Sequence, residues 1–335
     1  MVLGLGVGLA LARWLGLVQA AFSCVITVWF LAYGRALDRG RVGPSLRIVQ
    51  ALLESTLPWV SIVLVASSQG AVYALGSWVP PLSSLQGGDF YEFSHRFLAG
   101  GLGLFTLLLA VLLLVKERRV WLRWLGLIAV LGVVAQAILG GQVVIRLLHY
   151  WLPVIHACFA EIVFAAVVGI AVFTSKWWLS EKPQLADKGS PSIHFLAVLN
   201  AAVIYLQVIL GAGFRHKDIP IWPHAAGALV VLGTVTWTAV ALRKRFGELR
   251  ELSRARILLH AIFGAQFLLG ILAYWSRLTT AEAPQPMPVM VVLTVVHTVV
   301  GAILFAFSVL VALMCYRAVA RGGEVAARAP QVTTG

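Results

Sequence analysis

The sequence has 335 residues, of which 60% are hydrophobic and only 12% are charged. This balance excludes an ordinary soluble domain and indicates a protein of the lipid bilayer. The formal net charge is +13. The basic residues gather in alternate loops, however, which indicates membrane topology and excludes a nucleic-acid-binding surface.

Nine apolar runs are long enough to cross about 30 Å of hydrocarbon as helices. The first run could be a secretory signal peptide, but it is long and has no small-residue cleavage site, so we expect a retained anchor. The runs therefore predict an all-α integral membrane protein. In chain order they are 14–34, 50–76, 92–115, 120–145, 150–174, 193–212, 221–243, 256–276 and 288–316.

Most of the 26 Lys and Arg residues lie in every second loop and in the C-terminal tail. By the positive-inside rule, these segments are cytoplasmic. We therefore expect a multi-pass protein of the cell membrane, with its N-terminus outside and its C-terminus in the cytoplasm. The basic segments are 35–47, 116–123, 176–188, 243–256 and 317–328.

The eight runs after the first form two sets of four, joined by a polar loop. The string Gln-x-x-Leu-Gly occurs at 136–140, 207–211 and 266–270, and its first and last copies occupy matching places in the two sets. The pattern predicts a pseudo-symmetric pair of four-helix bundles. The expected parts are an additional N-terminal helix with its inner loop (1–49), a first half (50–175), an inner linker (176–192), a second half (193–317) and an inner tail (318–335).

Four of the eight histidines lie near the outer ends of the inward-running helices, two in each half. One such histidine is typical of interfacial packing, but a set of four indicates function because polar groups are costly inside a membrane. The residue four positions after each is small, which leaves room for a flat ring or simply for close helix packing. The histidines are His95, His156, His224 and His297, followed by Ala99, Ala160, Ala228 and Gly301.

Neutral imidazole suits iron, copper and zinc, but zinc favours one tetrahedral site with four ligands. Two separate pairs fit axial ligation of two haems better. We predict that His95 pairs with His156, and that His224 pairs with His297.

The remaining four histidines have no equivalent residues in the internal repeat. We expect His149, His194, His216 and His260 at the membrane interface, and Cys24, Cys158 and Cys315 as packing residues. The segment 215–217 (Arg-His-Lys) could pair with haem propionates or form a solvated loop.

Glu92 stands three residues before His95 and therefore on nearly the same helix face, and no counterpart occurs before the other three histidines. A carboxylate beside a metal-bound ring could move protons or position water. A glutamate near a helix N-terminus is also favoured by the helix dipole alone. Glu161 is the only carboxylate in the middle of a run, where a proton route and a hydrogen-bonded helix contact are both open.

The string Glu92-Phe93-Ser94-His95-Arg96 resembles the Glu-x-x-His-Arg signature of haem A synthases. The resemblance implies oxidation of the C8 methyl group of haem O to the formyl group of haem A, a component of cytochrome oxidase. It implies that His95 and His156 flank the substrate haem O, that Glu92 takes part in the oxidation, and that His224 and His297 hold a haem b that passes electrons. Haem O synthase and cytochrome oxidase assembly factors are the implied partners.

The sequence departs from the family in three places. The outer loop 77–91 has no cysteine pair, the first run is additional to the usual eight, and residues 69–76 lack a Gly-Gly-x-Thr-Arg-like stretch. A dihaem membrane cytochrome that only transfers electrons is the competing interpretation. A transporter would fit the repeat but would leave the four histidines without a shared purpose.

Overall fold

The structure is a computed structural model of the chain. It describes residues 88–145, 151–180, 184–284 and 287–320, with the backbone alone for 88–93 and 144–145. The predicted helices at 14–34 and 50–76 lie outside the described residues.

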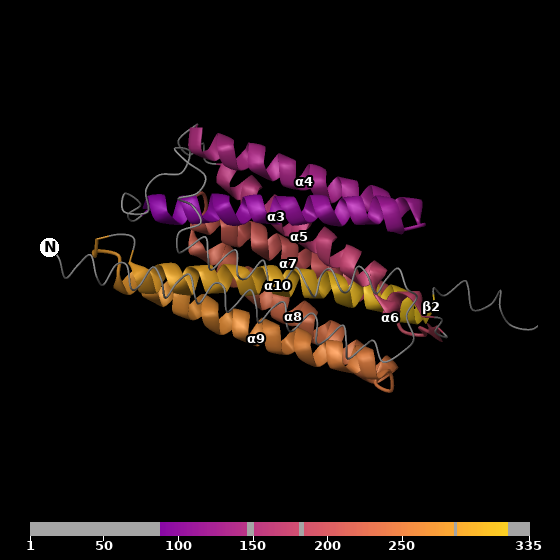
Figure 1. Ribbon diagram of the computed structural model, residues 1–335. Coiled ribbons are helices and arrows are strands. Elements are labelled where there is room, and N and C mark those ends of the chain that lie inside the picture. Colours follow the sequence, from indigo (N-terminus) through magenta and orange to yellow (C-terminus); the bar gives the residue numbers. More distant parts are fainter. Residues whose placement is uncertain (1–87, 146–150, 181–183, 285–286, 321–335) are drawn as a thin grey trace, which may run out of the picture. The chain divides into compact units, whose positions relative to one another are not determined.

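Seven long helices make up most of the described chain (Figure 1). Each is long and apolar enough to cross a membrane, which confirms the predicted all-α membrane fold and the seven described runs. They are α3 (Gly88–Lys116), α4 (Val120–Ile145), α5 (Trp151–Thr174), α7 (Ile193–Arg215), α8 (Ile221–Phe246), α9 (Arg250–Thr279) and α10 (Pro288–Ala318).

Three short elements accompany the long helices: α6 (Lys176–Leu179), β1 (Leu185–Ala186) and β2 (Val319–Ala320). The described residues belong to two compact units. The first contains α3, the start of α4 and α6, and the second contains the rest of α4 together with α5 and α7 to α10.

Local sequence signals explain several helix ends. The Ser192 side chain accepts a hydrogen bond from the Phe195 N–H and caps the start of α7. Pro288 is the first residue of α10, where its missing N–H costs nothing. Between α3 and α4, the Glu117 carboxylate accepts hydrogen bonds from the N–H groups of Arg118 and Arg119.

Helices α7, α8, α9 and α10 form a closed ring. Each packs against the next along the chain, and α10 packs back against α7. Helices α8 and α10 therefore occupy opposite corners, as do α7 and α9. Large apolar side chains such as Trp222, Leu229 and Leu268 are exposed on this bundle, as expected for a surface in contact with lipid.

The most tightly packed part of the ring lies toward the C-terminal ends of α8 and α10. The buried residues of α8 begin at Val231, and those of α10 begin at Leu304. Leu242, Leu259 and Val311 are fully buried there. The helix segments that carry His224 and His297 precede this core.

The linker before α7 is bound to the same end of the bundle. Strands β1 and β2 pair in parallel, so Leu185 lies opposite Val319. The Asp187 carboxylate accepts a hydrogen bond from the N–H of Ile193 at 2.6 Å. It also forms an ion pair with Arg245 at 3.4 Å. These contacts tie the start of α7 to the ends of α8 and α10.

Candidate haem-binding site

Two of the predicted ligands face each other inside the ring of α7 to α10. His224 lies in the first turn of α8, and His297 lies in the third turn of α10. Their ring centroids are 6.2 Å apart, and the ring planes are at 89°. A metal ion bonded at about 2 Å to one nitrogen of each ring would hold the centroids roughly 6 Å apart. The spacing of this pair is therefore compatible with axial ligation of one iron.

The surroundings of this pair also fit a haem. The Nδ1 atoms of His224 and His297 are buried without a hydrogen-bond partner, and a buried nitrogen in that state is costly. No residue of α8 before Val231, and none of α10 before Leu304, is fully buried. Unpartnered imidazole nitrogens and incomplete side-chain packing are both expected of residues that hold a large ligand.

On α7, two residues of the recurring string pack against His224. The Gln207 amide donates to the backbone carbonyl of His224 at 2.7 Å. A Cβ atom on Gly211 would lie 2.8 Å from Cε1 of the same ring. Only glycine allows the imidazole to approach the α7 backbone this closely.

On α9, the equivalent residues pack against His297. The side-chain nitrogen of Gln266 lies 3.4 Å from Nε2 of the His297 ring. A Cβ atom on Gly270 would lie 3.0 Å from Cε1 of that ring. On the histidine's own helix, a Cβ atom on Gly301 would meet Gln266 at 2.9 Å. The small residue four positions after His297 thus accommodates a glutamine of α9, the preceding helix.

The same arrangement occurs a third time between α4 and α5. The Gln136 amide donates to the backbone carbonyl of His156 at 3.0 Å. A Cβ atom on Gly140 would lie 3.2 Å from Cε1 of the His156 ring. The sequence revealed the recurring string but did not assign it to the histidines. The sequence contained the information for this assignment, because each copy lies on the helix directly before one that carries a histidine.

Glu92 and His95 both lie near the start of α3, three residues apart on one helix. His95 is exposed within the described chain, and the side chain of Glu92 is outside the description. His95 belongs to the first compact unit, whereas His156 belongs to the second. The pairing of these two histidines and the role of Glu92 stay predictions.

The cationic segment 215–217 lies at the end of α7, beyond His224. Lys217 adopts φ 68°, and the Asp218 N–H donates to the Gly213 carbonyl at 2.9 Å. Burial lowers the pKa of His216, and Arg215 lowers it further.

Arg277 on α9 is a further cation of this bundle that the sequence did not single out. Its guanidinium lies 4.8 Å from the centre of the Phe214 ring, and Phe214 precedes the cationic segment directly. Pairing of the segment 215–217 with propionates stays a prediction.

Two of the remaining histidines contact backbone carbonyls of the described chain. His194 is buried, where its Nε2 lies 3.2 Å from the Val319 carbonyl. Its ring also packs against Tyr316 at 4.6 Å. His260 contacts the Arg256 carbonyl at 3.1 Å. His149 lies outside the described residues.

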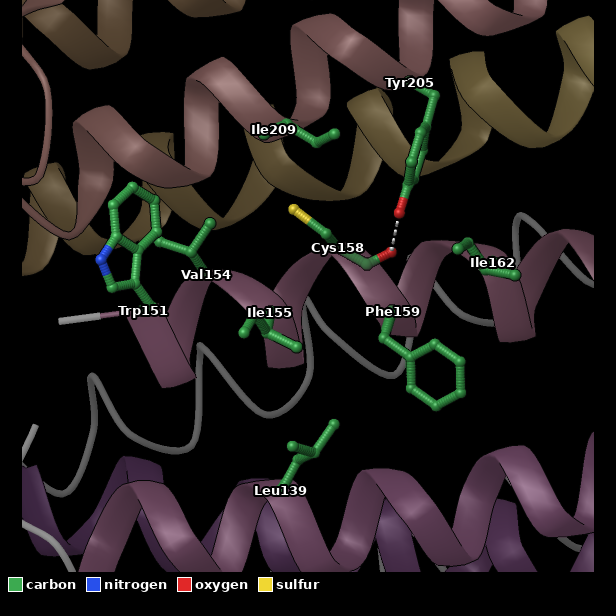
Figure 2. A pocket seen from close by; sticks show the side chains of 9 residues that line it. All are labelled: Leu139, Trp151, Val154, Ile155, Cys158, Phe159, Ile162, Tyr205 and Ile209. Atoms are coloured by element: carbon green, nitrogen blue, oxygen red, sulfur yellow. Dashed lines mark hydrogen bonds between the residues drawn. The ribbon is translucent and has the colours of Figure 1, made fainter. Parts of the chain in front are cut away.

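An apolar pocket of about 520 Å³ lies between α4, α5 and α7 (Figure 2). Tyr205 and Ile209 from α7 border one side, and Leu139 from α4 borders the other. The Tyr205 hydroxyl donates to the Cys158 carbonyl at 3.3 Å. The remaining lining residues come from α5 and are Trp151, Val154, Ile155, Cys158, Phe159 and Ile162.

Glu161 lies on α5, one to two turns beyond His156. One of its carboxylate oxygens is buried without a hydrogen-bond partner. Among the described residues, no three His, Cys, Asp or Glu side chains come together as a metal site. The described cysteines, Cys158 and Cys315, are free and buried, and Cys24 lies outside the described residues.

These observations define a class of protein: a multi-spanning helical membrane protein with a histidine pair enclosed by a four-helix ring. Residues 81–221 match the haem A synthase family COX15-CtaA, described as cytochrome oxidase assembly protein. The match confirms, over this range, the resemblance carried by Glu92 to Arg96. It includes His95 and His156 and ends before His224. No curated protein and no solved structure matches the chain.

Proposed function

We propose that this protein is a haem A synthase-like oxidoreductase that serves cytochrome oxidase assembly. It would oxidise the C8 methyl group of haem O to a formyl group, taking the oxygen atom from water and releasing four protons, with the four electrons passing to an external electron acceptor. The observation that carries the proposal is the family match over 81–221, which contains the Glu92 to Arg96 string.

The second half would hold the electron-transferring cofactor, haem b. His224 and His297 would be its axial ligands, and the 6.2 Å separation of their rings supports this assignment. When bound, the haem supplies reversible one-electron transfer. The protein's contribution is to fix the two imidazoles and to enclose them between α7 and α9.

The first half would hold the substrate, haem O, between His95 and His156. The apolar pocket between α4, α5 and α7 suits the hydrocarbon parts of such a ligand. Glu92 would accept a proton or position water next to the reacting methyl group. The second half has no carboxylate at the equivalent position, because Ile221 and Thr294 stand three residues before its histidines. The two sites would therefore differ in chemistry.

We further propose that the chain lies in the cell membrane with its C-terminus in the cytoplasm. The basic ends of α8 and α10, which include Arg243 and Arg317, support this orientation by the positive-inside rule. The histidines would then lie toward the outer leaflet. Haem O synthase would deliver the substrate, and assembly factors of cytochrome oxidase would receive the product.

The deciding experiment is co-expression with a haem O synthase, followed by extraction and mass analysis of the haems. The wild-type chain should yield haem A or its hydroxylated intermediate. Glu92→Ala should retain bound haem but accumulate haem O, and Glu248→Ala, on an exposed inner turn, should behave as wild type. If Glu92→Ala produces haem A at the wild-type level, Glu92 has no role in the oxidation. If the wild type binds haem but yields neither haem A nor its hydroxylated intermediate, the chain is instead a cytochrome that only transfers electrons. A purified protein without a Soret band would favour a transporter.

A further inference from the structure

We propose that Glu161 is a proton-binding residue linked to reduction of the haem in the second half. The Glu161 carboxylate would take up a proton when an electron arrives between His224 and His297, and would release it when the electron leaves. This inference rests on the proposed function, because that function supplies both the haem and the electrons.

The first observation is the depth of Glu161 in the membrane. It lies roughly 15 Å along α5 from Trp151, the first residue of the helix, and therefore near the middle of a hydrocarbon layer of about 30 Å. One of its carboxylate oxygens is buried without a hydrogen-bond partner. An ionisable group in this position is costly, so a functional role is the first explanation to test.

The second observation is the direction in which Glu161 faces. Val154 and Cys158 of α5 form a buried cluster with Ala212 of α7, and Tyr205 packs against this cluster. Glu161 follows Cys158 by three residues and Val154 by seven, so the three side chains lie on one face of α5. Glu161 therefore faces α7, the first helix of the second half.

The third observation is a chain of contacts from this face toward the proposed haem ligands. The Tyr205 hydroxyl donates to the Cys158 carbonyl at 3.3 Å, and the Tyr205 ring packs against Phe305 of α10 with 5.1 Å between the ring centroids. Phe305 lies roughly two turns beyond His297 on the same helix. Packed side chains thus connect the helix of Glu161 to the helix of a proposed ligand, and charges interact more strongly across protein than across water.

Electrostatics would couple the proton to the electron. Burial disfavours a charged carboxylate, and a nearby negative charge disfavours it further. An electron that reduces the haem adds such a charge, so it favours the protonated carboxyl group. The proposed oxidation of haem O releases electrons and protons in equal numbers, so a proton is available for each electron.

The neighbouring titratable groups leave this role to Glu161. In the part of the chain that the structure describes, Cys158 on α5 and Tyr205 on α7 interact electrostatically with Glu161. A thiol and a phenol are ordinarily neutral near pH 7. The carboxyl group is therefore the member of this cluster that can exchange the proton.

The inference predicts how the reduction potential of the haem depends on pH. A group that binds a proton on reduction makes the potential fall as the pH rises, so the wild type should show this fall. Glu161→Gln cannot exchange the proton and should lose most of it. Glu161→Asp keeps a carboxyl group and should retain more of the fall than Glu161→Gln.

The experiment is a redox titration of the purified haem-loaded protein at a series of pH values, followed at the Soret band. The control is Glu248→Gln, which removes an exposed carboxyl group and should keep the wild-type dependence. Infrared difference spectroscopy of the wild type provides a measurement that needs no variant, and reduction should produce a carboxylic acid band in it.

The same dependence on pH in Glu161→Gln and in the wild type overturns the inference, even where the wild type makes haem A. A wild-type infrared difference spectrum without a carboxylic acid band also overturns it. A wild-type protein that binds no haem overturns the proposed function and this inference with it.

Discussion

Gly140, Gly211 and Gly270 lie under the imidazoles of the following helices. The three positions share a spacing of four residues from a glutamine, so each pair lies on one face of its helix. Two other glycines of these helices differ. A Cβ atom on Gly141 or Gly264 would meet no atom within 4 Å, so these two positions carry no such requirement.

Replacing Gly270 with alanine tests this requirement. The new methyl group would lie 3.0 Å from Cε1 of His297, and the ring must shift to relieve the contact. We expect reduced haem retention and a loss of about 1–3 kcal/mol in stability, which is typical of overpacking. Haem content per protein and thermal unfolding in detergent provide the measurements.

Gly264→Ala on the same helix is the matched control for this change. It should retain haem at the wild-type level, because the added methyl group meets no neighbour. Equal haem loss in the two variants would show that α9 tolerates alanine at neither position. The close contact between Gly270 and the His297 ring would then have no special role.

At the scale of elements, hydropathy predicted the described membrane helices well. The run 120–145 coincides with α4, and the run 150–174 begins one residue before α5. Helix α9 begins at Arg250, six residues before the predicted start, because its first turns are charged and lie outside the apolar run. Hydropathy therefore locates the part of a helix that crosses the bilayer and not its cytoplasmic end.

The contacts between elements could not be predicted in the same way. Strands β1 and β2 have two residues each, too few for an alternating pattern. The burial of His194 depends on the end of α10, which is more than a hundred residues away in the chain. The glutamine contacts depend on how each helix is rotated about its axis. The recurring string indicates this rotation only when each copy is considered together with the histidine of the following helix.

The turn between α3 and α4 provides a prediction about pH. Hydrogen bonds from the Arg119 guanidinium to Glu117, at 3.0 and 2.7 Å, hold the pKa of Glu117 at about 2, against an ordinary value of 4.5. A lowered carboxylate pKa stabilises the folded state fully above the ordinary value, and this contribution is lost as the pH falls toward 2.

Glu117→Gln should therefore be less stable than the wild type at pH 7, and the difference should shrink as the pH falls below about 4. Chemical unfolding of the detergent-solubilised proteins at pH 7 and pH 3 measures this difference. A gap of constant size at both pH values would contradict a role for the charged carboxylate and would point to packing at the turn.

At the scale of the whole molecule, the distribution of basic residues agrees with the proposed orientation. The turn between α8 and α9 lies in the basic segment 243–256. The connection between α9 and α10 contains Glu282 and lies at the end of the ring nearer His297. The proposed orientation therefore places the first of these turns in the cytoplasm and the second outside.

Accessible cysteines test this orientation directly. Ala281→Cys and Glu248→Cys each replace an exposed residue in one of the two connections. In intact cells, an impermeant maleimide should label Ala281→Cys at once and Glu248→Cys only after permeabilisation. The wild type provides the background, because its described cysteines are buried. The reverse labelling pattern would invert the proposed topology.

The contacts between the linker and the C-terminal ends of α8 and α10 have a consequence for how the gene could be divided. Gln184 contacts the Arg317 carbonyl at 3.4 Å, Asp187 pairs with Arg245 at 3.4 Å, and His194 contacts Val319. A polypeptide beginning at Gln184 would keep all of these contacts within itself. A gene divided at this point would therefore encode a second fragment that keeps all of these linker contacts. Such a fragment would be suited to a protein that assembles from two separately translated chains.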